Sequence, residues 1–205
     1  MIHVRTARDS DLETIAGWLA EPRIAKWLDF GMARPPAAVA LKYATAQGSQ
    51  RLFTFAPARG QEVAPIGVVG LSSIHPTFRT ALLWYALGEP RYAGRGLTSM
   101  AAVEVVRIGF GELDLRAIHA WVVAGNQASA RILEKIGFRP IGRQRQCHDI
   151  DGRLHDRLLF DIVPRELADH VAPQVGRRRV MTIAPAVPAP FSVADGAILL
   201  TIPWG

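Results

Sequence analysis

The chain has 205 residues, of which 49% are hydrophobic and 20% charged, so it suits one domain with an appendage and can bury a sizeable core. Its apolar runs are shorter than the roughly 18 residues of a membrane span, and the polar N-terminus lacks the apolar core of a secretory signal. The net charge of +6 favours anionic partners, but its only cluster, at 177–179, has no accompanying aromatics, so we do not expect nucleic-acid binding.

The first third of the chain predicts one strand and two helices. Residues 2–6 form the strand, and Ser10 with Glu13 makes a capping-box pattern for a helix over 10–20. A loop or a broken helix over 22–36 and a second helix over 36–47 follow.

The middle of the chain changes to a strand pattern. Short apolar, β-prone runs separated by turn residues predict an antiparallel meander over 51–56, 66–72 and 81–87. Residues 96–111 then predict a helix, because apolar residues recur on one face of it. That face consists of Leu97, Met100, Ala101, Val105 and Ile108.

The next part of the chain adds three strands and one helix. Asn126 is a suitable N-cap for a helix over 127–136, and Gly137 is suitable for its C-terminal end. The strands are expected over 117–123, 139–147 and 154–162, with a hairpin turn at Asp151–Gly152.

This order predicts a mixed α/β domain over 1–163 and a proline-rich extension over 164–205. Two apolar runs in the extension, 180–183 and 197–202, predict strands that pair with the domain's own sheet or with a second subunit. The single cysteine, Cys147, cannot form an internal disulfide, and together with the missing signal it predicts a cytoplasmic protein.

The junction RYAGRGLTSM, residues 91–100, has the composition of an anion site. It lies between a strand and a helix, where unpaired helical N–H groups and the helix dipole attract negative charge. Gly94 and Gly96 allow positive φ and close backbone approach, and Arg91 and Arg95 suit phosphate oxygens.

Two common phosphate motifs do not fit this junction. A P-loop needs a Gly-Lys dipeptide, which the chain lacks. A dinucleotide fingerprint needs a third glycine where Ser99 stands, and an acidic residue near Arg116.

The remaining pattern, Arg-x-x-Gly-x-Gly, resembles the acyl-CoA motif of the GNAT superfamily of N-acyltransferases. The resemblance extends over 2–162: IHVRTARDSDLETIAGWL is similar to the family's first strand and helix, and NQASARILEKIGF to its second landmark. The closing stretch over 142–162 resembles the Rim-type branch, which includes ribosomal-protein N-terminal acetyltransferases. The family fold implies a mostly antiparallel sheet of about six or seven strands, splayed between the fourth and fifth, with helices on both faces.

The resemblance implies transfer of acetyl from acetyl-CoA to a primary amine, without a metal, by direct attack in a ternary complex. It also implies a role for each matching residue. Asn126 contacts the CoA arm, Ser129 protonates the departing thiolate, and the Leu87 N–H stabilises the oxyanion. Backbone groups of the fourth strand, at Tyr85, Ala86 and Leu87, pair with pantetheine. The glycine loop binds pyrophosphate through Tyr92, Ala93, Gly94, Arg95, Gly96, Leu97 and Thr98.

The general base is left open. Many family members have a tyrosine as general acid at the position that Leu133 occupies here. Another branch has a glutamate base early in the fourth strand, where this chain has no carboxylate. The candidate acid/base groups, each with a structural alternative, are Glu89, His119, His148, His155 and Asp156. Asp156 also matches a Rim-type strand acid that holds a neighbouring loop. These departures leave a non-catalytic acyl-CoA-binding module as the alternative.

The acceptor cleft is expected between residues 22–36 and the final hairpin. Trp27, Phe30 and Trp84 are its candidate lining residues, with core packing as their alternative role. The resemblance implies a protein N-terminus or a small amine as the acceptor, and family analogy predicts a homodimer, formed through the C-terminal extension.

Overall fold

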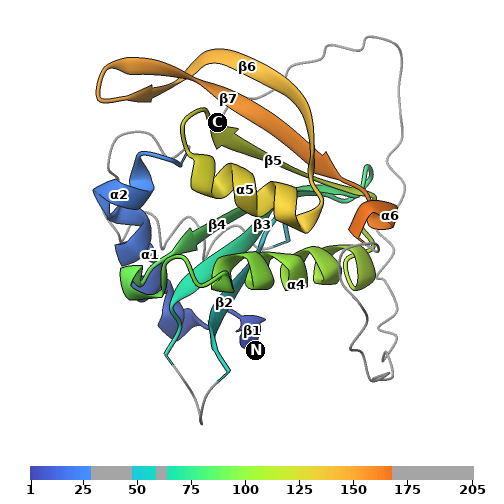
Figure 1. The fold of residues 1–205 in the computed structure, drawn as a ribbon. Coiled ribbons are helices and arrows are strands. Elements are labelled where there is room, and N and C mark those ends of the chain that lie inside the picture. Colours follow the sequence, from blue (N-terminus) through green and yellow to red (C-terminus); the bar gives the residue numbers. More distant parts are fainter. Residues whose placement is uncertain (29–47, 59–63, 168–205) are drawn as a thin grey trace, which may run out of the picture. The chain divides into compact units, whose positions relative to one another are not determined.

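The computed structural model describes residues 1–28, 48–58 and 64–167 (Figure 1). Several predicted features lie outside these residues: the second helix, Phe30, the arginine cluster and the two tail strands. The role of the tail in a dimer therefore stays a prediction. Of the helices in the described ranges, none has the length and apolar character to cross a membrane.

One sheet of seven strands organises the described residues. From edge to edge, its strands are β1 (Ile2–Thr6), β2 (Arg51–Pro57), β3 (Gly67–His75), β4 (Thr80–Leu87), β5 (Ala117–Val123), β7 (Arg153–Ile162) and β6 (Arg139–Ile150). Neighbouring strands are antiparallel except β4 and β5, which are parallel. The predicted meander and the mostly antiparallel α/β fold are confirmed.

Helices cover both faces of this sheet. They are α1 (Leu12–Ala20), α2 (Pro22–Ala25), α4 (Leu97–Gly111), α5 (Gln127–Ile136) and α6 (Pro164–Leu167). Figure 1 shows α4 and α5 lying together along the sheet. Val69 belongs to the core under α4 and α5, whereas Val68 belongs to the core under α1 and α2. Successive strand residues point to opposite faces, so the two cores lie on opposite sides of the sheet.

Small residues form the buried stripe of α4. Ala101, Ala102 and Gly109 are buried, whereas Met100 is 42% exposed. A Cβ added at Gly109 would lie 2.8 Å from the Ile118 side chain, so the helix lies close to the sheet here. The prediction that Met100 belongs to the buried face is wrong, because close approach of the helix turns its small residues toward the strands.

Asp11, not Ser10, organises the start of α1. Its carboxylate accepts the Arg8 N–H at 2.7 Å and two nitrogens of Arg5 at 2.6 and 2.9 Å. Ser10 lies inside a 3-10 turn before the helix, so the predicted capping box with Glu13 is wrong. A charge-assisted network replaces the expected hydroxyl cap, and the hydrogen bond from Arg5 contributes most to holding the pKa of Asp11 below its ordinary value.

The C-terminal elements follow the sequence pattern closely. The Asn126 side chain accepts the N–H of Ser129 at 3.2 Å, as an N-cap does, and Gly137 ends α5 with a φ of 106°. The β6–β7 turn has positive φ at both Asp151 and Gly152, which suits a two-residue hairpin. Helix α6 then opens the predicted extension, and its Leu167 is buried in the core, so the core continues past residue 163.

Strands β4 and β5 separate partway along their length. They pair over three residues each, from Thr80–Ala117 to Leu82–His119. Beyond that point β4 stays paired with β3 as far as Leu87, while β5 pairs with β7. The predicted splay is confirmed, and within the described residues the second half of β4 has no β5 partner.

Candidate functional site

The loop between β4 and α4 carries two glycines in the left-handed region. The φ angles are 73° at Gly94 and 71° at Gly96, and a Cβ added at either would meet nothing within 4 Å. A side chain there would be strained by the backbone conformation and not by crowding. The positive φ that the glycine pattern predicts is confirmed, and open space lies beside both residues.

Helix α4 begins without a side-chain cap. Gly96 is its N-cap residue, and the helical ladder starts with the Met100 N–H donating to the Gly96 carbonyl at 3.1 Å. The first-turn amides, over 97–99, precede that ladder. A helix of 15 residues adds the positive end of its dipole at the same place, so this turn can bind an anion.

Two arginines beside the loop stack on one tyrosine. The guanidinium carbons of Arg91 and Arg95 lie 5.1 and 5.3 Å from the ring centre of Tyr92. Arg91 also lies 3.7 Å from the Glu89 carboxylate, and its side chain is 73% exposed. The tyrosine therefore holds two cations beside the uncapped helix, an arrangement that suits phosphate oxygens.

A hydrogen bond joins β4 to α5 beyond the point where the sheet opens. The Tyr85 hydroxyl donates to the Ser129 carbonyl at 2.9 Å, and the Ser129 N–H donates to Asn126. Burial raises the pKa of the Tyr85 phenol. Leu133, at the position where many family members have a tyrosine acid, is 1% exposed in the core. The structure therefore brings together Tyr85 of the fourth strand with Asn126 and Ser129 of the second landmark, three predicted site residues from two separate motifs.

Arg23 of α2 holds the end of β4. Its guanidinium donates to the carbonyls of Leu87, at 3.1 Å, and of Gly88, and its Nε pairs with Glu21 at 2.6 Å. Gly88 is required here because an added Cβ would lie 2.1 Å from the Trp18 indole. Sequence reasoning missed both residues, since nothing in the local pattern signals a contact between α2 and β4.

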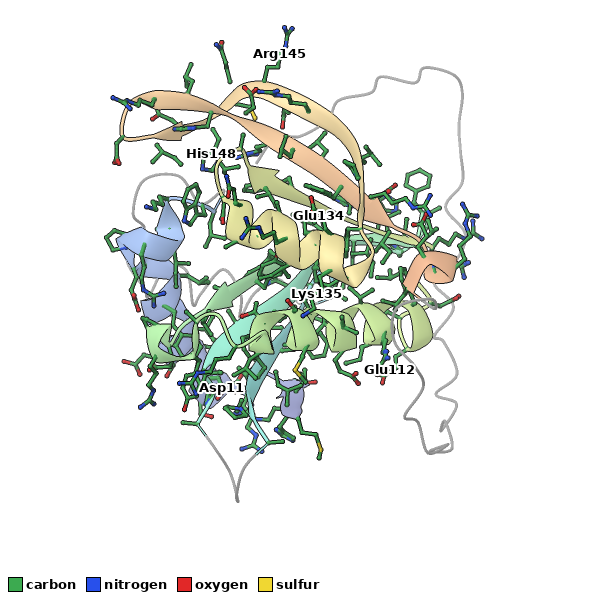
Figure 2. The ribbon with its side chains drawn as sticks, in the orientation of Figure 1. Asp11, Glu112, Glu134, Lys135, Arg145 and His148 are labelled. Carbon is green, nitrogen blue, oxygen red and sulfur yellow. The ribbon has the colours of Figure 1, made fainter. Side chains whose placement is uncertain are left out.

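His148 of β6 links the final hairpin to the end of α2 (Figure 2). Its Nε2 lies 2.8 Å from the Lys26 carbonyl, which only accepts, so this nitrogen carries the proton. Its Nδ1 accepts from Arg157 at 3.0 Å, and that guanidinium stacks 3.9 Å over Trp121. The residue is 6% exposed and both ring nitrogens are hydrogen-bonded, so His148 has a structural role and is not a free base.

Asp156 holds a bulge in β6. Its carboxylate accepts the N–H of Gln146 at 2.8 Å and pairs with Arg143. The pairing register between β6 and β7 shifts in this region. The Gln146 N–H contributes most, and Arg143 next, to holding the pKa of Asp156 below its ordinary value. These contacts match the prediction that Asp156 holds a neighbouring segment, which is the alternative to a role as acid or base.

The other candidate acid/base groups do not converge. His119 stands at the last β4–β5 pair, and burial lowers its pKa while Asp161 acts in the opposite direction. Its partner Leu82 is about 16 Å along the strand from Leu87 at 3.3 Å per residue, so His119 does not reach a reaction centred at Leu87. The two remaining candidates lie elsewhere. Glu89 lies beside Arg91, and His155 faces His148 in the pairing of β6 with β7.

The candidate cleft aromatics occupy different positions. Trp84 belongs to the core cluster under α1 and covers Gly70, where an added Cβ would lie 2.3 Å from its ring. Trp27 follows α2, with the ammonium of Lys26 5.0 Å from its ring centre. Phe30 lies outside the described residues. Their joint lining of one acceptor cleft stays a prediction.

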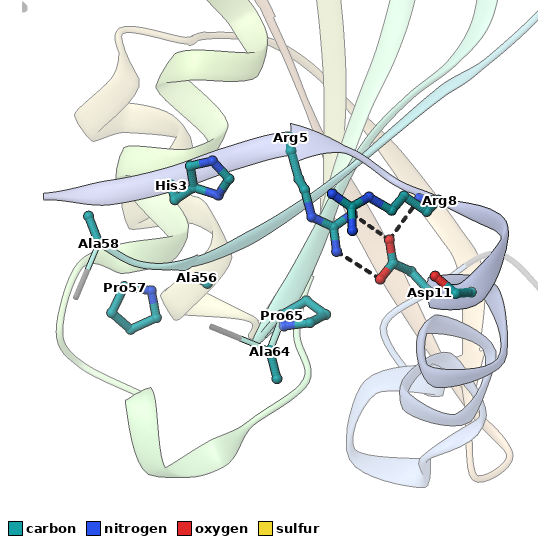
Figure 3. A pocket seen from close by; sticks show the side chains of 10 residues that line it. His3, Arg5, Arg8, Asp11, Ala56, Pro57, Ala58, Ala64 and Pro65 are labelled. Carbon is teal, nitrogen blue, oxygen red and sulfur yellow. Dashed lines mark hydrogen bonds and ion pairs between the residues drawn. The ribbon is translucent and has the colours of Figure 1, made fainter. Parts of the chain in front are cut away.

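A separate hollow of about 660 Å³ lies beside β1, at the sheet edge far from the hairpin (Figure 3). Its polar lining includes His3, Arg5, Arg8 and Asp11, and Arg5 is paired with Asp11. The hollow shares no residue with the glycine loop or with the start of α5. In the described ranges, no group of three or more His, Cys, Asp or Glu residues is placed to hold a metal ion.

Comparisons with known proteins agree with this geometry. Residues 2–139 match the family described as the acetyltransferase (GNAT) domain. A protein of Bacillus subtilis (strain 168), YdaF, named for ribosomal N-acetyltransfer, is 24% identical over 80% of this chain and 92% of its own length. The N-acetyltransferase p20 of Bacillus licheniformis is 26% identical over 77% of this chain and 90% of its own.

Solved structures share the fold. The spermidine N-acetyltransferase of Vibrio cholerae, solved with CoA and spermine, superposes with a TM-score of 0.70 at 19% identity. The match covers 82% of this chain and 98% of that chain. At this identity the likeness concerns the fold alone.

Proposed function

The chain belongs to the GNAT acetyltransferase family and is an N-acetyltransferase, and we propose that it transfers the acetyl group of acetyl-CoA to a primary amine by direct attack in a ternary complex. The observation that carries the proposal is the open glycine turn at Gly94 and Gly96, continuous with the uncapped start of α4. The turn directly follows the half of β4 that has no β5 partner among the described residues.

In this proposal the cosubstrate lies along one continuous stretch of chain. The amides of residues 92–98, with Arg91 and Arg95, bind the pyrophosphate. The backbone of residues 85–87 pairs with the pantetheine arm, as a strand partner would. Asn126 and Ser129 border that arm from the first turn of α5, which the Tyr85 hydrogen bond supports.

The transfer step needs few groups from the protein. The amine nitrogen attacks the thioester carbonyl, so that a C–N bond forms and, after the tetrahedral intermediate, the C–S bond breaks. The Leu87 N–H stabilises the oxyanion, and Arg23 holds the peptide that follows it. The amine loses its proton to water, since His119 lies too far along the strand to reach Leu87. Ser129 protonates the thiolate and regains a proton from that water. Positioning then supplies much of the rate.

The acceptor is proposed to be the α-amine of a protein or a small amine. The match with YdaF, whose name refers to ribosomal N-acetyltransfer, favours the protein N-terminus. The net charge of +6 argues against polycationic amines, although the solved spermidine enzyme shares the fold.

A thiol-release assay with the full-length protein tests this function. Acetyl-CoA is supplied with a panel of short peptides, amino acids, polyamines and aminoglycosides, and CoA affinity is measured by calorimetry. We expect saturable release of CoA thiol with at least one class of amine. Tight CoA binding without release across the panel would favour the non-catalytic module, and absence of CoA binding would overturn the proposal.

A further inference from the structure

The Tyr85 side chain has no part in the transfer chemistry proposed above, which uses only its backbone. It lies on the α5 face of β4, packed against the main core, and its hydroxyl reaches the carbonyl of Ser129 at 2.9 Å. That carbonyl belongs to the first turn of α5, where the N–H of the same residue is held by Asn126 at 3.2 Å. Both backbone groups of Ser129 are therefore fastened, one from β4 and one from the N-cap.

We propose that Tyr85 is a positioning residue that fixes the first turn of α5 against β4 and so sets Asn126 and Ser129 for the acyl-CoA arm. The inference rests on the proposed function for the identity of that arm. The observed link itself, between Tyr85 and Ser129, does not depend on it.

The topology explains why such a link is needed. Strand β5 leads directly into α5, and β5 leaves β4 after the Leu82–His119 pair. Past that pair, no sheet ladder between these two strands holds α5 at a fixed distance from β4 in the described residues. The Tyr85 hydroxyl crosses this opening at the level of the predicted site, where a small displacement of the turn would move two site residues together.

The geometry favours positioning over acid catalysis. The phenol proton is directed at a carbonyl oxygen, so protonating a thiolate would require this hydrogen bond to break. Burial also raises the pKa of the phenol, which weakens it as an acid. Tyr85 therefore does not replace the tyrosine acid that is missing at Leu133.

Tyr85→Phe tests the proposal with little risk to folding. The ring stays in the core, and the Ser129 carbonyl keeps its helical partner four residues on. We expect the CoA dissociation constant and the KM for acetyl-CoA to rise about fivefold, and kcat to fall by a similar factor because the displaced turn also carries Ser129. In the protein without ligand, hydrogen exchange at the amides of Ser129 and Ala130 should accelerate about fivefold.

Thr54→Val is the matched control. It removes a buried hydroxyl, 1% exposed, from β2, outside the candidate site. It should leave CoA affinity and exchange at α5 unchanged. A double variant, Tyr85→Phe with Asn126→Ala, adds a second test, because two groups that place the same turn should give non-additive losses of CoA affinity.

Each outcome decides one point. Unchanged CoA affinity and unchanged exchange in Tyr85→Phe would overturn the positioning role while leaving the transferase function intact. A large loss of kcat with CoA affinity and exchange at Ser129 unchanged would overturn it in favour of acid catalysis. If the wild type bound no CoA, the proposed function would fail, and exchange at Ser129 would still decide whether Tyr85 holds the turn.

Discussion

The proposed cosubstrate side and the proposed acceptor side of the candidate site are built in different ways. On the cosubstrate side, residues 91–98 are contiguous in sequence and present backbone groups: two glycines with positive φ and an uncapped helix start. On the acceptor side, side chains from β5, β6 and β7 meet, and His148 of β6 contacts the Lys26 carbonyl at the end of α2, 122 residues away in sequence. One side depends on backbone conformation, and the other on side chains brought together by the fold.

This difference has a consequence for substitutions. A backbone site tolerates many side chains but not a change that alters φ or introduces the wrong charge. The acceptor side depends on hydrogen bonds between buried groups, so removing one partner leaves another unsatisfied. We therefore expect cosubstrate binding and acceptor use to respond to separate sets of variants.

Gly96→Glu should have the largest effect, and it acts on the cosubstrate side. It adds a negative charge to the proposed pyrophosphate turn and forces a side chain onto a residue with a φ of 71°. We expect CoA affinity, measured by calorimetry, to fall about 100-fold or more, since a like charge at a binding site costs several kcal/mol. Gly17→Glu is the control, because Gly17 also has open space but lies on α1. Equal affinities in the two variants would rule out the turn as the CoA site.

His148→Ala should affect the acceptor side alone. The buried imidazole bridges Lys26 and Arg157, so its loss frees the hairpin from the end of α2. We expect kcat/KM for the acceptor to fall about tenfold, with CoA affinity within about twofold of wild type. His148→Gln keeps an N–H donor for the Lys26 carbonyl and should recover part of the loss. A parallel fall in CoA affinity would show that the two sides are not independent.

Arg23→Lys should give a smaller effect at the boundary between the two sides. The planar guanidinium donates to the carbonyls of Leu87 and Gly88, and a lysine ammonium does not reproduce this fork. Because the side chain is 39% exposed, we expect kcat to fall only about fivefold, with the KM for acetyl-CoA little changed. Stopped-flow measurement of the acetyl-transfer step shows whether the fall in kcat arises from that step or from product release. An unchanged kcat would remove Arg23 from the placement of Leu87.

The same contrast explains what could be predicted from the sequence. The glycine turn, the Asn126 cap and the β6–β7 hairpin turn are local, because neighbouring residues determine their backbone conformation, and the structure confirms each of them. The binding roles of Gly94 and Gly96 remain predictions. Their conformation, however, could be expected from two glycines placed before a helix.

Long-range contacts could not be predicted in this way. No local pattern pairs Arg23 with Leu87, or Tyr85 with Ser129, since each contact depends on how separate elements pack. The capping box was mispredicted for a related reason: Arg5, on the preceding strand, makes Asp11 a stronger acceptor than the hydroxyl of Ser10. The buried face of α4 was misassigned because its approach to the sheet depends on Gly109.

Asp156→Asn should have the smallest effect, and it tests whether a protein carboxylate acts as the base. The Gln146 N–H and Arg143 hold the pKa of Asp156 below its ordinary value of 3.8, so the group is ionised throughout the neutral range. The stabilisation that it gives to the β6 bulge is present above the unfolded pKa and is lost only as pH falls through the lower folded pKa. An asparagine oxygen can still accept the Gln146 N–H, although its bond to Arg143 becomes weaker. We therefore expect kcat/KM between pH 6 and 9 to change less than about threefold and to keep the pH profile of the amine acceptor. Disappearance of that profile in Asp156→Asn would identify Asp156 as the base and would contradict its assignment as a purely structural residue.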